Sequence, residues 1–180
     1  MPKNIAFLRA INVGGHTVKM DRLRALFVEM GFSGVETFIA SGNVIFDPIS
    51  ENPAALEKKI ESHLESALGY EVRTFIRTSA ELAAVVDYEP FSDAKLTAEG
   101  STLYVGFLPD PPTAEAIQKL LGFSNAVDEF HVAGREVYWL CHKKFHESDF
   151  SGAKLEKVLG LKTTLRNVST VRKLAAKYPG

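Results

Sequence analysis

The sequence contains a single cysteine, Cys141, so the chain forms no internal disulfide. Such sparse cysteine use suits a reducing compartment, where thiols stay reduced. Long apolar runs are also missing, and no stretch approaches the length of a membrane-spanning helix. Residues 5–8 are too few for the core of a signal peptide, and Arg9 interrupts them. These absences predict a cytoplasmic protein with no membrane partner.

Net charge is nearly absent, because 21 Lys or Arg stand against 22 Asp or Glu. A charge of −1 gives the whole molecule no general attraction to nucleic acid or to acidic membranes. The charge is uneven, however: residues 141–180 carry +6 and the first 140 residues carry −7. Either the basic C-terminal part lies on the acidic body, which we favour, or it forms a surface that faces anions.

Apolar periodicity predicts the elements of the first half. Residues 4–9 fit a buried strand. Gly31 is well placed as a left-handed helix stop, because it follows an amphipathic stripe. That stripe consists of Leu23, Leu26, Phe27 and Met30. Residues 35–40 and 44–46 then flank Ser41-Gly42-Asn43, a good hairpin turn because Gly and Asn tolerate positive φ.

Capping signals frame the next helices. Asn52 can cap a helix with Pro53 at its first position, and Gly69 ends that helix. Thr78 and Glu81 have the spacing of a capping box for a third helix. Residues 72–76 fit the strand between these two helices.

The order of elements recurs after residues 89–100, which contain Pro90 and Gly100 and resemble a linker. Further strands are predicted at residues 102–108, 127–132, 137–141 and 163–166, with a hairpin at 133–135. The fold class is therefore α+β: two consecutive ferredoxin-like split βαβ units, with antiparallel sheets and helices packed on one face. The predicted domains are residues 1–88 and 101–180, joined by the linker 89–100.

This topology brings two polar breaks of the first half together. The first and second strands of such a unit run parallel, and the third lies antiparallel between them. The loop 9–19 and the turn 41–43 therefore leave the sheet at the same end. We treat them as one candidate site.

Gly14-Gly15 lies just before a helix N-terminus, where exposed N–H groups and the helix dipole favour an anion. Arg9, His16 and Lys19 would add charge-assisted contacts. The spacing matches neither GxxxxGK[ST] nor GxGxxG, and no cofactor is expected. The alternative is that the glycines only let the loop turn.

Asn12, Ser41 and Asn43 would present amide and hydroxyl groups to the same ligand. As turn residues, Ser41 and Asn43 need no such explanation. Ser41 is a weak candidate nucleophile, because only His16 is near in the pattern and no acid is placed to orient it.

Arg166-Asn167 marks a strand end and a helix start in the second unit, where Asn167 is a candidate N-cap. Arg166 either grips an anion or is a surface arginine beside a capped helix. A composite site with Arg9, Asn12 and Ser41 requires this strand end to face the loop corner of the first unit, and we predict that arrangement.

Two further clusters invite a chemical interpretation that their surroundings oppose. Cys141, His142 and His146, with His131, Glu147 and Asp149 near in sequence, suggest zinc. Lys143-Lys144 disfavours a cation there, and no metal site is expected. The aromatic residues Tyr104, Phe107, Tyr138 and Trp139 suggest RNA stacking, but no RNP-type run occurs, and core positions explain most of them better.

Several motifs resemble those of a bacterial family. The matching residues are Leu8-Arg9-Ala10-Ile11-Asn12-Val13-Gly14-Gly15, Met20, Leu23-Arg24, Gly31-Phe32, Ser41-Gly42-Asn43-Val44, Thr164, Arg166, Asn167, Thr170, Val171, Lys173 and Leu174. With this set, the chain is similar to the bacterial domain-of-unknown-function 1697 family. The resemblance implies a two-lobed α/β architecture and no particular activity.

The function hypothesis is a protein that binds a small anionic or polar ligand at the RxINVGG/SGN corner. One alternative is a nucleic-acid-binding protein that uses the basic C-terminal surface. Another is an enzyme acting on a phosphorylated metabolite at the first site.

Overall fold

The computed structural model describes residues 2–12, 15–39, 42–144 and 147–180. The chain divides into two compact units, Met1–Ala83 with Leu174–Gly180, and Ala84–Lys173. This grouping differs from the division expected from the sequence, because the last seven residues belong with the first unit. The boundaries at residues 88 and 101 stay a prediction, which limited proteolysis between residues 89 and 100 would test.

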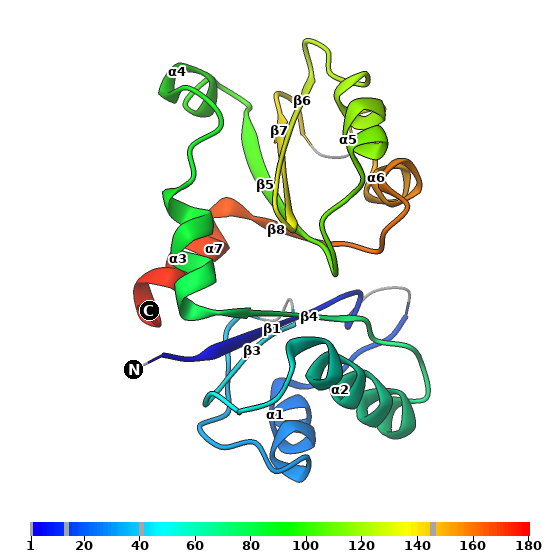
Figure 1. Ribbon diagram of the computed structural model, residues 1–180, viewed down its shortest axis with the longest axis vertical. Helices are drawn as coiled ribbons and strands as arrows, with labels where there is room; N and C mark the ends of the chain where they lie inside the picture. The colour runs from blue at the N-terminus through cyan, green and yellow to red at the C-terminus, as the bar shows by residue number, and fades with distance from the viewer. Residues whose placement is uncertain (1, 13–14, 40–41, 145–146) are drawn as a thin grey trace. The chain divides into compact units, whose positions relative to one another are not determined.

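The first unit is a four-stranded antiparallel sheet in the order β2-β3-β1-β4. Its strands are β1 (Asn4–Leu8), β2 (Glu36–Thr37), β3 (Asn43–Phe46) and β4 (Thr74–Thr78). Helices α1 (Met20–Glu29) and α2 (Pro53–Leu68) lie together on one face of this sheet (Figure 1). Helix α3 (Ser79–Asp87) follows β4 without a break.

The core of the first unit lies between that sheet face and the two helices. The apolar stripe predicted for α1 supplies Leu23, Leu26 and Phe27, all fully buried. Helix α2 contributes Leu56, Ile60 and Leu64 to the same cluster. Burying such side chains supplies about 1.5–3 kcal/mol each, so this helix–sheet layer stabilises the unit.

The second unit repeats this topology, with strand order β6-β7-β5-β8. Its strands are β5 (Thr102–Phe107), β6 (Asp128–Ala133), β7 (Glu136–Cys141) and β8 (Thr164–Asn167). Helices α5 (Ala114–Leu121) and α6 (Gly152–Leu159) pack side by side on one sheet face around the buried Trp139. Helix α4 (Asp93–Leu96) precedes β5, and α7 (Val168–Lys177) follows β8. The predicted fold class is confirmed.

The predicted helix ends are also confirmed. The side chain of Asn52 accepts a hydrogen bond from the Ala54 N–H at 2.9 Å, and Gly69 ends α2 with φ +83°. Thr78 and Glu81 form the reciprocal capping box at the start of α3, with bonds of 2.8 and 3.1 Å.

Two predicted segments differ in the structure. Strand β2 covers only Glu36–Thr37, although residues 35–40 were expected to be extended. Ile39 has a left-handed backbone with φ +59°, which stops the strand. The linker 89–100 contains α4, whose first turn is capped by Ser92. Within the described residues, no helix combines the length and the apolar character that crossing a membrane requires.

Candidate functional site

The loop after β1 and the turn before β3 meet at one end of the first sheet. Gly42 lies beside β1, because the Leu8 N–H donates to the Gly42 carbonyl at 2.8 Å. The Arg9 N–H donates to the Arg73 carbonyl at 2.9 Å, so the chain leading into β4 joins the same end. The predicted proximity is confirmed for these residues. Gly14 and Ser41, two of the predicted ligand residues, lie outside the described residues.

A close approach at Gly42 requires glycine. Its φ is +80°, and a Cβ there would lie 2.7 Å from Cγ2 of Ile11. The same added atom would lie 3.1 Å from Cβ of Leu8. A side chain would therefore suffer both backbone strain and a clash, so Gly42 fixes how tightly the turn sits on the loop.

The loop is held by one of its own side chains, Asn12, and by Tyr70, which follows helix α2. Asn12 Oδ1 accepts a hydrogen bond from the Val18 N–H at 2.8 Å, which ties the start of the loop to the residue before Lys19. The Tyr70 hydroxyl donates to the Ile11 carbonyl at 3.2 Å, and its ring stacks on His16 at 3.8 Å between centroids. Burial raises the pKa of Tyr70, so its hydroxyl stays protonated and continues to donate.

The sequence interpretation missed Tyr70. It follows the helix stop Gly69 by one residue, and only the sheet topology places it beside a loop 59 residues away. We call the set of residues 9–12, 15–19, 42–43 and 70 the loop corner.

Asn43 is a structural residue at the loop corner. Its side chain is fully buried, and Nδ2 donates to the Phe38 carbonyl at 2.8 Å. This bond holds the chain between β2 and β3, as expected of a turn residue. Arg9 is half-buried, whereas Gly15 and Lys19 are exposed. Gly15 has φ +84° and faces open space, because a Cβ there would meet nothing within 4 Å.

Helix α1 begins beside Lys19 without a side-chain cap. Among the other described helices, α2, α4, α5 and α6 each begin with a side chain that accepts a first-turn N–H. The first N–H groups of a helix need acceptors and carry partial positive charge. The α1 N-terminus therefore presents donors toward the loop where the sequence predicted an anion.

Arg166 and Asn167 belong to the second unit. Asn167 Oδ1 accepts a hydrogen bond from the Ser169 N–H at 2.9 Å, so the predicted N-cap of α7 is confirmed. Arg166 is only 7 % exposed, so it is not the surface arginine that one of the two sequence interpretations expected. Nη1 donates to Thr164 Oγ1 at 2.7 Å and to the Leu165 carbonyl at 3.0 Å. Burial lowers the pKa of Arg166 to about 10, which leaves it charged at neutral pH. A composite site with the loop corner stays a prediction.

The suspected zinc and RNA-stacking residues have other roles. Outside the masked residues 1, 13–14, 40–41 and 145–146, which include His146, no group of side chains could hold a metal ion. Cys141 is buried, and its thiol donates to the Lys143 carbonyl. Trp139 is also buried and donates from Nε1 to Asp128 Oδ1 at 2.9 Å. Phe107 and Tyr138 are buried as well, which confirms the core interpretation for three of the four aromatics.

Part of the basic C-terminal charge gathers on the helical face of the second unit. Lys119, Lys154 and Lys157 line a hollow of about 710 Å³ between α5 and α6, together with Phe123, Ala153 and Val158. Lys154 Nζ lies 4.5 Å from the centroid of the half-exposed Phe123 ring. A second hollow of about 310 Å³ continues past Lys157 to Lys162. We call these four lysines with Phe123 the lysine surface.

Comparison with known proteins places the chain in a family. The family described as "Protein of unknown function (DUF1697)" matches residues 1–138. The chain belongs to this family. Among solved structures, the conserved bacterial protein SP0830 from Streptococcus pneumoniae is similar, with a TM-score of 0.71 and 19% identity over 97% of each chain. At this identity the likeness establishes the fold alone. No curated protein matches the chain.

Both loop-corner motifs of this DUF1697 chain, RxINVGG and SGNV, lie inside the matched range. The closing motif around Arg166 and Asn167 lies beyond residue 138. Because the family description assigns no activity, a function for the chain has to come from the chemistry of its own side chains.

Proposed function

We propose that this DUF1697 protein binds a small anionic or polar ligand at the loop corner. The observation that carries the proposal is the uncapped N-terminus of α1, where the exposed Lys19 is the residue that precedes the helix. A phosphate or carboxylate there would accept hydrogen bonds from first-turn N–H groups and interact favourably with the helix dipole. Lys19 would add a charge-assisted contact.

Three contacts hold the described residues of the loop, 9–12 and 15–19. Asn12 closes its C-terminal part, Tyr70 holds Ile11, and Gly42 packs against Ile11 from the other side. A preorganised loop loses less conformational entropy on binding than a free one. Asn12 and Asn43 thus support the site by shaping it, since their described hydrogen bonds go to the backbone of the same unit.

A thermal-shift screen tests this proposal. The probes are inorganic phosphate, phosphate monoesters and dicarboxylates, with chloride at equal ionic strength as the reference. A ligand of the folded state raises the unfolding temperature as its concentration rises above Kd. Lys19→Ala should weaken that shift, and Lys58→Ala, an exposed lysine on α2, should leave it unchanged. Equal behaviour of the two variants, or no shift with any probe, would rule out the site.

The lysine surface supports nucleic-acid binding as a second candidate function. Three of its lysines line one hollow with Phe123, and Lys162 lines the next, an arrangement suited to phosphates and a stacked base. Anisotropy titrations with short single-stranded RNA should then give an affinity that falls steeply with salt, with a slope of about 0.7 per phosphate contact. Lys154→Ala and Lys157→Ala should each weaken binding, and a salt-independent affinity would argue against this candidate. Cytoplasmic location stays a prediction.

A further inference from the structure

The second unit contains a row of three hydrogen-bonded polar side chains, at the sheet end opposite its Gly134 hairpin. Ser101 comes just before β5, and His142 comes just after β7. The register pairs Thr102 with Cys141, so these two residues face each other at the strand ends. Glu129 lies on the neighbouring strand β6, opposite Leu140. Three residues distant in sequence therefore meet through the sheet register.

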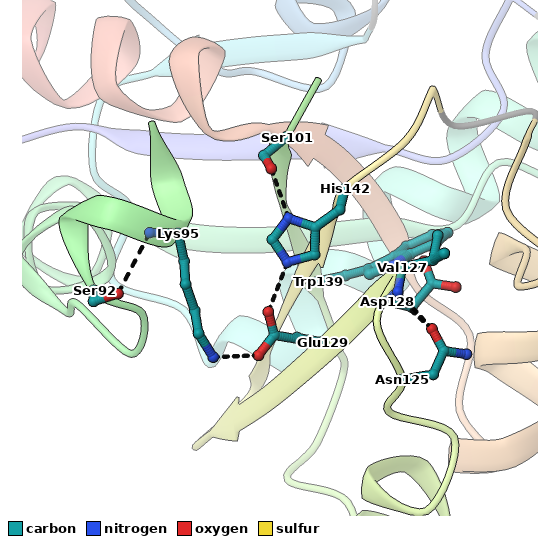
Figure 2. Close-up of polar contacts among 9 residues, drawn as sticks. All are labelled: Ser92, Lys95, Ser101, Asn125, Val127, Asp128, Glu129, Trp139 and His142. Carbon is teal, nitrogen blue, oxygen red and sulfur yellow. Dashed lines mark hydrogen bonds and ion pairs between the residues drawn. The ribbon is translucent and has the colours of Figure 1, made fainter. Parts of the chain in front are cut away.

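The hydrogen bonds run in one direction through the imidazole. The Ser101 Oγ lies 2.6 Å from His142 Nδ1, and His142 Nε2 lies 2.6 Å from Glu129 Oε2. Figure 2 shows the ring of His142 between the hydroxyl and the carboxylate. An ionised carboxylate only accepts, so Nε2 carries the hydrogen. In the neutral ring, Nδ1 is then the acceptor, and the Ser101 hydroxyl donates to it.

Lys95 fixes the far end of this row. Its Nζ lies 2.5 Å from Glu129 Oε1, the oxygen that His142 does not use (Figure 2). Hydrogen bonds from His142 and then from Lys95 hold the pKa of Glu129 below its usual range. Glu129 therefore stays ionised at neutral pH and keeps the imidazole in one tautomer and one orientation.

Ser101 also lines a hollow of about 270 Å³ in the same unit. Its other walls include Leu96, Leu103, the first residues of α7 and Arg172. Arg172 is exposed and supplies a positive charge within reach of a small molecule in the hollow. The row of three residues thus ends at a space that a substrate can enter.

We propose that Ser101 is a nucleophile activated by His142, and that this site hydrolyses small esters bearing a negative charge. Ser101 Oγ attacks the ester carbonyl carbon while its proton passes to His142 Nδ1. The tetrahedral intermediate collapses, and the alcohol leaves with that proton. Water then attacks the acyl-serine and gives a proton to His142, which returns it to Ser101 as the acid departs. Glu129 is a positioning residue, and Arg172 holds the anionic group of the substrate.

This arrangement exchanges the two ring nitrogens relative to the usual serine triad, in which the acid contacts Nδ1. The chemistry depends on one nitrogen being protonated by the acid and the other accepting from the nucleophile. Both conditions are met by the distances to His142. The site uses none of the loop-corner residues and does not depend on the function proposed there.

Covalent labelling of the full-length protein tests the nucleophile. A fluorophosphonate transfers its phosphonyl group to an activated serine and releases fluoride. Intact-mass analysis should show one added group, and peptide mapping should place it on Ser101. Ser101→Ala should abolish labelling, and His142→Ala should slow it by about 100-fold or more. Glu129→Gln should slow labelling as well, with partial recovery in Glu129→Asp.

The matched control is Ser148→Ala. Ser148 is another half-buried serine of this unit, and its hydroxyl donates to Asp128 Oδ2 at 2.7 Å without touching His142. This variant should label at the wild-type rate. Circular dichroism should show that all variants remain folded. Absence of labelling in the folded wild-type protein, or labelling that persists in Ser101→Ala, would overturn the proposal.

The charge preference is tested with two matched substrates, 4-acetoxybenzoate and its neutral methyl ester. The wild-type protein should hydrolyse the anion with the higher kcat/KM. Arg172→Ala should reduce that preference about tenfold or more, as expected for a charged hydrogen bond. Lys144→Ala removes an exposed charge that does not line the hollow, and this variant should keep the preference for the anionic substrate. An unchanged preference in Arg172→Ala would overturn the assignment of the anionic substrate.

Discussion

The two units share their element order and sheet topology, but their polar side chains gather at opposite sheet ends. In the first unit they lie where β1 ends, at the loop corner. In the second unit the corresponding end is a short hairpin, where the Leu108 N–H donates to the Arg135 carbonyl at 2.9 Å. The long loop of the first unit is replaced there by a connection containing Pro111-Pro112, and α5 is capped by Thr113. Only the first unit leaves its first helix uncapped at that end.

The two units also differ at the opposite end of each sheet. Just beyond the paired part of β1 and β3, Lys3 and Asp47 form an ion pair at 2.5 Å. Just beyond the paired part of β5 and β7, Ser101 and His142 form the row that continues to Glu129. At the first position the ion pair is extended by Ser33, whose hydroxyl donates to Asp47 Oδ2 at 2.9 Å. The row in the second unit differs in passing through an imidazole, between a hydroxyl and a carboxylate.

The largest expected effect contrasts the two turns. Gly42 and Gly134 both have positive φ, but only Gly42 has atoms within 3 Å of an added Cβ. Gly42→Ala should lower the free energy of unfolding by about 2–4 kcal/mol, because strain and a clash add. Gly134→Ala should cost about 1 kcal/mol from strain alone. Urea denaturation measures both, and equal losses would show that the loop corner is loosely packed.

The next effect contrasts the ends of α1 and α5. Gly31 follows α1 with φ +90°, whereas Gly122 ends α5 with φ −65°. Gly31→Ala should destabilise by about 1 kcal/mol, because a left-handed position disfavours any Cβ. Gly122→Ala should leave the denaturation midpoint nearly unchanged, since its backbone is already right-handed. A neutral Gly31→Ala would mean that α1 ends differently in solution.

A smaller effect of opposite sign is expected at the helix starts. Lys19→Asp gives α1 the acceptor it lacks and should stabilise the protein by about 0.5–1 kcal/mol. Thr113→Ala removes the α5 cap and should cost about 1 kcal/mol. The Lys19→Asp variant should also lose the phosphate-induced thermal shift, because its carboxylate occupies the anion position. Retention of that shift would separate the α1 N-terminus from ligand binding.

The smallest effect concerns the acid side of the stability curve. The hydrogen bond from Lys3, followed by that from Ser33, holds the pKa of Asp47 below the usual 3.8. A carboxyl group whose pKa is lowered by folding stabilises the folded state at pH values above its unfolded-state pKa. That stabilisation disappears as the pH falls through the folded-state pKa. NMR titration should find that the pKa of the Asp47 carboxyl lies below 3.8, and Lys3→Met should raise that pKa. A value at or above 3.8 in the wild-type protein would contradict the ion pair.

Local signals predicted the fold well. Helix caps depend on residues that are close together in the sequence, so these helix ends could be predicted from it. The examples are Asn52-Pro53, Gly69 and the Thr78–Glu81 pair. The short helix α4 was not predicted, because four residues are too few to show a helical repeat of apolar side chains. The early end of β2 also escaped, since Ile39 is a β-branched residue in a conformation that such residues rarely adopt.

The site was predictable only in outline. Topology placed the loop after β1 beside the turn before β3, as the Leu8–Gly42 hydrogen bond confirms. The roles of Asn12 and Asn43 could not be inferred, because a turn amide bonds equally well to a ligand or to nearby backbone. Ser101, Glu129 and His142 carry no recognisable spacing, and only the pairing of β5, β6 and β7 brings them together.

The contrast between the two units predicts that the loop corner of the first unit binds anions and that the equivalent hairpin of the second unit does not. NMR titration of the full-length protein with inorganic phosphate compares the two places in one experiment. Amide signals of Gly15, Lys19 and the first turn of α1 should shift and saturate with one Kd, while those of Gly134 and Arg135 stay in place. Shifts confined to the lysine surface, or equal shifts at both sheet ends, would contradict the claim.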